Sequence, residues 1–112
     1  MKVVQLMIPA DRLADAVEFY TEGLGLESEA AEAGSIMFVV GSQQIKLIPM
    51  PGPLLQRHTN LSLHVHGLHE CVRHLVSTGR IPRSDLARSA NARGRFEISD
   101  PGGNIISLVE AR

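Results

Sequence analysis

The sequence predicts an α+β fold in which two similar halves share one core. Three observations lead to this prediction. The chain has 112 residues, the size of one ordinary domain. Its apolar segments alternate between strand-like and helix-like periodicity. The order of these segments in the first half, about residues 1–51, is repeated in the second half, about residues 58–112, after a proline-rich linker at about 49–57.

The first half is expected to form a strand, a helix and two or three further strands. Residues 2–8 are rich in β-branched and long apolar side chains and end at a proline, which is typical of a strand. Asp11 is a candidate N-cap, and the apolar residues after it recur at three- and four-residue spacing. This pattern predicts a helix over about 11–23. Two short apolar runs on either side of Gly41 and Ser42 predict a hairpin.

The second half follows the same order. Residues 61–66 alternate between apolar and polar side chains, which predicts a strand, and a helix is expected from Leu68 until Gly79 ends it. A shift of 55 positions places four apolar helix residues of the first half on four of the second. The pairs are Leu13 with Leu68, Ala16 with Cys71, Val17 with Val72 and Tyr20 with Leu75. Such a coincidence is typical of divergent repeats that each need the other to close a core.

Composition excludes several classes of protein. Hydrophobic residues make up 44% of the chain and charged residues 21%, and no apolar run approaches the roughly 20 residues of a membrane helix. Charged residues and a proline precede any signal-peptide core, and the single cysteine, Cys71, cannot form an intramolecular disulfide. We therefore expect a cytoplasmic protein that does not bind membranes. A pI near 6.5 and few aromatic residues argue against nucleic-acid binding.

Charge is distributed unevenly between the halves. Residues 1–56 contain three basic and seven acidic side chains, and residues 57–112 contain eight basic and five acidic ones, so the halves differ in sign. Five arginines lie between Arg80 and Arg95. This stretch either receives phosphate or carboxylate groups, or is a solvated loop that pairs with the acidic half or with a second subunit.

Two motifs at opposite ends of the chain point to a family. The first, at 8–27, is IPADRLADAVEFYTEGLGLE, in which the pair Phe19 and Tyr20 precedes a Leu-Gly-Leu helix exit. The second, at 100–108, is DPGGNIISL, a closing hairpin. With the internal repeat, the chain resembles the vicinal oxygen chelate superfamily, which contains glyoxalases, bleomycin resistance proteins and extradiol dioxygenases. The resemblance implies a single domain of two paired βαβββ modules, whose mixed sheets curl around a cleft with helices outside.

The resemblance also implies the place of a site. Members usually hold a divalent metal with a histidine on the first strand, a glutamate on the fourth, a histidine or glutamine on the fifth and a glutamate on the eighth. The matching positions here are Gln5, Lys46, Asn60 and Ser107. They supply no carboxylate and no imidazole, and Lys46 places an ammonium where the cation would sit. We therefore expect no metal cofactor at this site.

A hydrogen-bonding surface takes the place of the metal set. Strand alternation adds His64, Arg95 and Glu97 to it. Lys46 and Arg95 are suited to act as counter-charges for a small organic ligand with an anionic or carbonyl group, while the amides orient it. Alternatively, Lys46 pairs with Glu97 across the cleft and serves stability alone. The predicted ligand-binding residues are Gln5, Lys46, Asn60, His64, Arg95, Glu97 and Ser107.

Other functions remain open at this stage. A metal-dependent lyase, isomerase or dioxygenase of the same superfamily would need a divalent metal on non-standard ligands such as His64, Glu97 or Glu110. His58, His64 and His66 form a further candidate metal cluster.

Whether the protein is an enzyme is left open, and no catalytic residue is assigned. A metal-free enzyme would use Lys46 as electrophile and His64 or Glu97 as base. An interaction module in a larger complex is a third possibility, because the linker and the arginine-rich stretch are both candidate partner surfaces. Modules of this family commonly pair across a homodimer, so the resemblance also implies a dimer with its clefts near the interface.

Overall fold

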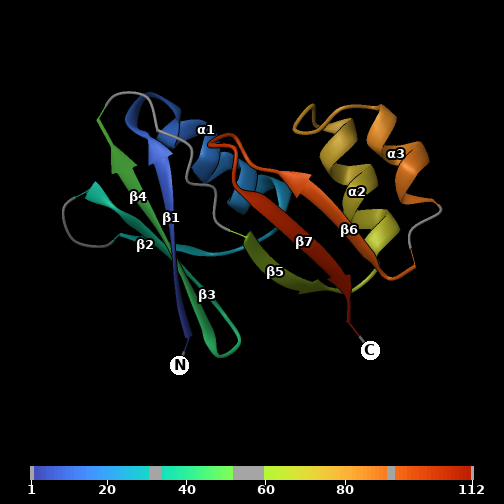
Figure 1. Cartoon of the computed structure of the whole chain (residues 1–112), viewed down its shortest axis with the longest axis horizontal. Helices are drawn as coiled ribbons and strands as arrows, with labels where there is room; N and C mark the ends of the chain where they lie inside the picture. Colours follow the sequence, from blue (N-terminus) through green and yellow to red (C-terminus); the bar gives the residue numbers. More distant parts are fainter. Residues whose placement is uncertain (1, 31–33, 52–59, 91–92, 112) are drawn as a thin grey trace.

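The computed structural model describes residues 2–30, 34–51, 60–90 and 93–111. It is an α+β structure of two mixed sheets with helices packed against them (Figure 1). The elements of the first half are β1 (Lys2–Pro9), a 3-10 turn η1 (Ala10–Arg12), α1 (Leu13–Glu18), a π-helical turn η2 (Phe19–Gly23), β2 (Ser28–Ala30), β3 (Ile36–Val40) and β4 (Gln43–Met50). Those of the second half are β5 (Asn60–Val65), α2 (Leu68–Ser77), α3 (Ser84–Ser89), β6 (Arg95–Ser99) and β7 (Ile105–Glu110).

The two sheets repeat one pairing scheme. Their strand orders are β1-β4-β3-β2 and β5-β7-β6. In each sheet the first strand of that half pairs in parallel with the last strand of the half: β1 with β4, and β5 with β7. On its other side the last strand pairs antiparallel with the strand before it in the chain: β4 with β3, and β7 with β6. The α+β class and the mixed sheets predicted from the sequence are confirmed. Among the described helices, none is long and apolar enough to cross a membrane.

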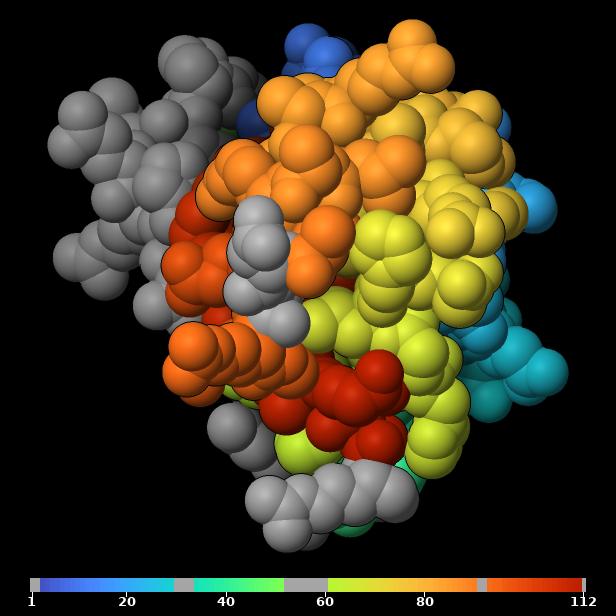
Figure 2. Space-filling model, turned by 90° about the vertical axis from the view of Figure 1, so that its right-hand side faces the viewer, coloured from blue at the N-terminus to red at the C-terminus, as the bar shows by residue number. Residues whose placement is uncertain are grey.

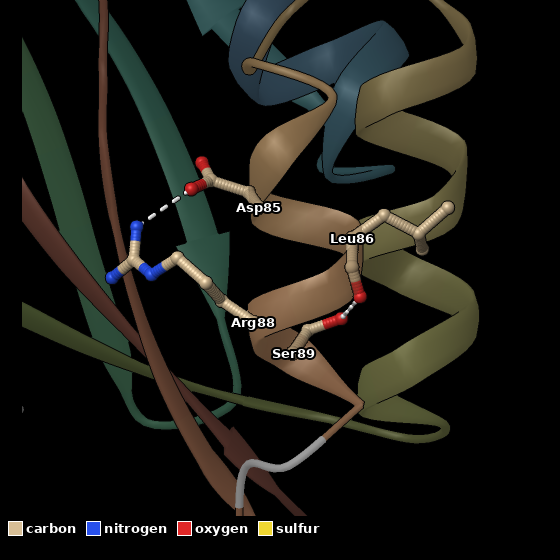
Figure 3. A network of polar contacts seen from close by, with 4 residues as sticks. All are labelled: Asp85, Leu86, Arg88 and Ser89. Carbon is tan, nitrogen blue, oxygen red and sulfur yellow. Dashed lines mark hydrogen bonds and ion pairs between the residues drawn. The ribbon is translucent and has the colours of Figure 1, made fainter.

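The arginine-rich stretch departs from the sequence prediction. Instead of a continuous loop, it contains α3, and the second sheet has three described strands where a βαβββ module would have four. Asp85 accepts a hydrogen bond from Arg88 at 2.8 Å, and the hydroxyl of Ser89 donates to the Leu86 carbonyl at 2.9 Å (Figure 3). The Arg88 guanidinium also lies 5.2 Å from the ring centroid of Phe96 on β6. This arginine therefore fixes α3 to the second sheet.

One hydrophobic core joins the halves. The first sheet buries alternate residues such as Leu6 and Ile45 against the helical segment that contains Tyr20. The second sheet buries its own alternate residues, among them Leu108, against Val72 of α2. In Figure 1, α1 lies between the two sheets, while α2 and α3 lie on the far side of the second sheet. The outer face of each sheet, opposite its helix, is left for a site.

The helix predicted over about 11–23 forms in three segments. Its last segment is π-helical, with the Leu24 amide donating to the Phe19 carbonyl at 3.1 Å. Phe19 and Tyr20 are both buried, with ring centroids 5.2 Å apart in an edge-to-face contact. A side chain at Gly23 would place its Cβ 2.8 Å from Leu75 Cδ2. A glycine is needed here because this segment packs directly on α2.

A buried polar network joins the first helix to the closing hairpin. The Tyr20 hydroxyl donates to Asp100 Oδ2 at 2.6 Å, and Asp100 Oδ1 accepts from the amides of Gly102 at 2.8 Å and Asn104 at 2.9 Å. The Asn104 side chain donates to the Met7 carbonyl at 3.3 Å. Burial, the nearby carboxylate and the hydrogen bond to it all raise the pKa of Tyr20 far above its usual value. The network connects η2, β1 and the hairpin before β7.

Candidate functional site

The outer face of the first sheet brings two predicted residues together. Gln5 and Lys46 are register partners in the parallel pair β1 and β4, and Met37 of β3 lies opposite Lys46. Alternation puts all three side chains on the face away from the core. Gln5 is exposed and Lys46 is half-buried. Lys46 forms no ion pair within the described residues.

The outer face of the second sheet brings three more together. Glu97 and Ser107 are opposite one another on β6 and β7, and the Ser107 hydroxyl donates to Glu97 Oε2 at 3.3 Å. Arg95 Nη2 donates to the same hydroxyl oxygen at 3.4 Å. Ser107 is only 3% exposed, whereas Arg95 and Glu97 are exposed. The serine thus links a cation and a carboxylate, and in the described part of the chain Glu97 contacts Ser107 and not Lys46.

Register draws attention to Ser62, which was not among the predicted ligand-binding residues. Ser62 is the β5 partner of Ser107, just as Gln5 is the β1 partner of Lys46. Asn60 lies two residues earlier in β5, opposite Ile105. The parallel register of the first and last strands of each half is the signal that identifies Ser62.

Glu110 has a structural task. Its Oε2 accepts a hydrogen bond from the Gly67 amide at 2.7 Å, and its Oε1 accepts one from the Leu68 amide at 2.9 Å. These amides are at the start of α2, which has no side-chain cap of its own. The hydrogen bonds from Leu68 and Gly67, and then the charge of His66, hold the pKa of Glu110 below its usual value. Glu110, which the sequence offers as a non-standard metal ligand, therefore caps a helix.

The histidines do not assemble a metal site in the part of the chain that the structure describes. His64 is exposed near the end of β5, opposite Val109. His58 lies outside the described residues. Across the ranges 2–30, 34–51, 60–90 and 93–111, no three His, Cys, Asp or Glu side chains are grouped so that they could hold a metal ion.

The two clusters lie on separate sheets. One consists of Gln5 and Lys46, and the other of Arg95, Glu97 and Ser107. Three surface cavities, of about 430, 380 and 270 Å³, lie elsewhere on the described surface and are not lined by any of these five residues. His64 lines the largest of them instead. The proline-rich linker predicted at about 49–57 begins within β4, and its residues 52–57 lie outside the described ranges.

Comparisons with known proteins agree with this architecture. Structures similar to the chain include lactoylglutathione lyase of Agrobacterium tumefaciens (18% identity, TM-score 0.69, 99% of this chain and 92% of the other covered). They also include TnmS3, an antibiotic-binding protein of Streptomyces sp. CB03234 (20%, 0.65, 100% and 97%). A third is the bleomycin-binding protein of Streptomyces verticillus in complex with copper(II)-bleomycin (16%, 0.68, 98% and 94%). No curated protein matches the chain significantly.

The family follows from the sequence itself. The family model of the Glyoxalase/Bleomycin resistance protein/Dioxygenase superfamily matches residues 2–108. This span takes in both motifs, every residue of the two clusters on the outer faces, and both sheets except the last two residues of β7. The chain belongs to the Glyoxalase/Bleomycin resistance protein/Dioxygenase superfamily.

Proposed function

We propose that the protein binds a small organic ligand with an anionic or carbonyl group, and that it does so without a divalent metal. Lys46 is the observation that supports this proposal most directly. Its ammonium is half-buried on an open sheet face beside the Gln5 amide and has no ion pair within the described residues. A partly desolvated cation without a counter-charge attracts an anion or a polarised carbonyl, and a neighbouring amide orients it.

The side chains at the family's metal positions do not fit a divalent cation. The ammonium of Lys46 repels a cation, and Gln5, Asn60 and Ser107, together with Ser62, the register partner of Ser107, offer only neutral oxygens. A metal-dependent enzyme would have to use Glu97 and His64 instead. The Glu97 carboxylate already accepts the Ser107 hydroxyl, and His64 is at the far end of β5. The proposed binding therefore does not involve a metal.

The positions of the aromatic side chains limit the class of ligand that the protein can bind. TnmS3 binds an antibiotic and the Streptomyces verticillus protein binds bleomycin, which supports a binding function for this chain too. All four aromatic side chains of this chain, Phe19, Tyr20, Phe38 and Phe96, are buried in its core. A large planar drug would find no ring to stack on. A compact anion or carbonyl compound held by Lys46 fits better.

We expect Lys46→Met to weaken the binding of an anionic probe about tenfold, because it keeps the aliphatic stem and removes the charged donor. The probe is 2-naphthoate, and binding is measured by the thermal shift it causes and by calorimetry. Lys46→Arg should retain most of the affinity. The matched control is Arg73→Ala, which removes one exposed positive charge from α2 and should leave binding unchanged.

Two results would count against the proposal. Equal binding of 2-naphthoate to the protein and to Lys46→Met would remove Lys46 from the site. Stoichiometric uptake of Zn²⁺, Ni²⁺ or Mn²⁺ by protein purified without chelator, lost in His64→Ala, would favour the metal-dependent alternative.

We also propose a homodimer in which the outer face of the first sheet is covered by the partner. Val3 is 54% exposed and Val39 is 46% exposed on this face, beside the half-buried Met7, Met37 and Ile48. Gln44 lies between Val3 and Val39, and Lys46 lies beside Met37, so the exposed apolar side chains alternate with polar ones. Large apolar side chains left exposed on one face are one feature of an association surface. The arrangement would let one protomer's Lys46 meet the partner's second sheet and so complete a site from two half-sites.

Val39→Glu should convert the dimer to a monomer, because the new carboxylate would be buried without a partner at the interface. Light-scattering mass and sedimentation measure the change. Ala14→Glu, on the exposed side of α1, is the control and should remain dimeric. A monomeric mass for the unmodified protein at micromolar concentration would overturn the dimer.

A further inference from the structure

A cavity lies at the junction of the two halves and away from both sheet-face clusters. Its volume is about 430 Å³, within the range of small-molecule sites. The first half supplies Val40 and the segment 22–26 that follows α1, and the second half supplies the end of β5 and one side of α2. Figure 2 shows α2 in yellow, with the blue-to-cyan chain after α1 along its right-hand edge.

The wall and the rim of this cavity differ in chemistry. Leu24, Leu26, Val40, Leu63 and Val65 form the apolar part of the wall. The polar part consists of two carboxylates, Glu22 and Glu70, three imidazoles and the thiol of Cys71, and its described residues include no lysine or arginine. With neutral imidazoles these described residues carry a formal charge of −2, which comes from the two glutamates.

Neighbouring groups neutralise this charge only in part. Arg73 lies 3.6 Å from Glu70, but both side chains are more than half exposed, so water screens the pair. Glu22 has no ion pair in the described part of the chain. His74 Nε2 lies 2.8 Å from the Glu22 carbonyl, which can only accept, so this nitrogen donates. In a neutral His74 ring, Nδ1 is then an acceptor. Together with the carboxylates of Glu22 and Glu70, it makes the polar part of the lining, called the rim below, rich in hydrogen-bond acceptors.

We infer that this cavity is a second binding site, one that takes a small apolar amine. The apolar body of such a ligand would replace water against the leucine and valine wall, and its ammonium would stay at the rim near Glu22 and Glu70. The site is separate from the proposed anion site, because its lining shares no residue with either sheet-face cluster and its charge is opposite to that of Lys46. The two sites therefore select probes of opposite charge.

The test uses three probes of one shape: 1-naphthylmethylamine, 1-naphthylmethanol and 1-naphthoate. Affinity is measured by calorimetry, and occupancy by the rate at which iodoacetamide alkylates Cys71, the only cysteine and a lining residue. We expect the amine to bind most tightly and to slow alkylation at least fivefold at saturation. The double variant E22Q/E70Q should weaken amine binding about five- to tenfold and leave the alcohol unaffected.

The control variant E27Q/E29Q removes two exposed carboxylates outside the cavity, with the same change in net charge, and should not alter amine binding. Lys46→Met should not alter it either, which separates this site from the anion site. Equal affinity for the three probes, amine binding without protection of Cys71, or an equal loss in E22Q/E70Q and E27Q/E29Q would each overturn the inference.

Discussion

Asp100→Ala should lower the free energy of unfolding by about 3 to 5 kcal/mol, measured by urea denaturation. Asp100 is 5% exposed and accepts hydrogen bonds from Tyr20, Gly102 and Asn104. Alanine would remove the acceptor of a buried hydroxyl and of two backbone amides, and the loss of such an acceptor costs about 1 to 3 kcal/mol where water cannot reach the donor. The closing hairpin would lose its attachment to the first helix at the same time.

Two further variants separate the contributions. Asp100→Asn keeps an acceptor oxygen and should cost less than half as much as alanine. Tyr20→Phe removes only the hydroxyl, and in a double-mutant cycle with Asp100→Ala it should show a coupling free energy of about 1.5 to 3 kcal/mol. A coupling near zero, with full additivity, would show that the 2.6 Å contact does not stabilise the protein.

Much of the fold could be predicted because local sequence patterns determine it. β1, the two hairpin strands and α2 follow from alternation, helical spacing and turn residues, and the repeat follows from superposing the helix positions. α3 could not be found in this way. It has six residues, too few for a clear period, and its contacts are Arg88 over Phe96 and Ser89 near His69. Such a helix depends on the surface beneath it and not on its own sequence.

Strand alternation predicts which side chains lie on the face of a strand away from the core, but not which strands share a sheet. The sequence prediction puts Gln5, Lys46, Glu97 and Ser107 on one surface, whereas the structure pairs Gln5 with Lys46 in the first sheet and Glu97 with Ser107 in the second. Pattern alone cannot supply register, so the sequence prediction gives the fifth-strand position to Asn60, whereas Ser62 is the register partner of Ser107. It also cannot supply long-range partners. Tyr20 and Asp100 are 80 positions apart, so no local pattern connects them. The sequence does carry one signal, because a tyrosine at a core position usually needs a buried hydrogen-bond acceptor for its hydroxyl.

Stability should decrease above about pH 10, and Tyr20 should be the cause. In the unfolded chain the phenol titrates near its usual pKa of about 10, whereas in the folded protein burial and Asp100 raise that pKa. The unfolded state therefore releases its proton first as the pH rises. The contribution is fully present below pH 10 and is lost above it, with a slope that approaches about 1.4 kcal/mol for each pH unit until the folded protein also titrates.

This prediction has an unusually clean readout, because the chain has one tyrosine and no tryptophan. Phenolate absorbance should remain absent in the folded protein above pH 10 and rise only together with the loss of far-ultraviolet ellipticity. Tyr20→Phe should start from a lower stability and show a shallower decrease over the same pH interval. Phenolate absorbance with a midpoint near pH 10 while the ellipticity is unchanged would mean that water reaches the hydroxyl. The Tyr20–Asp100 contact would then not be the link that holds the first helix to the closing hairpin.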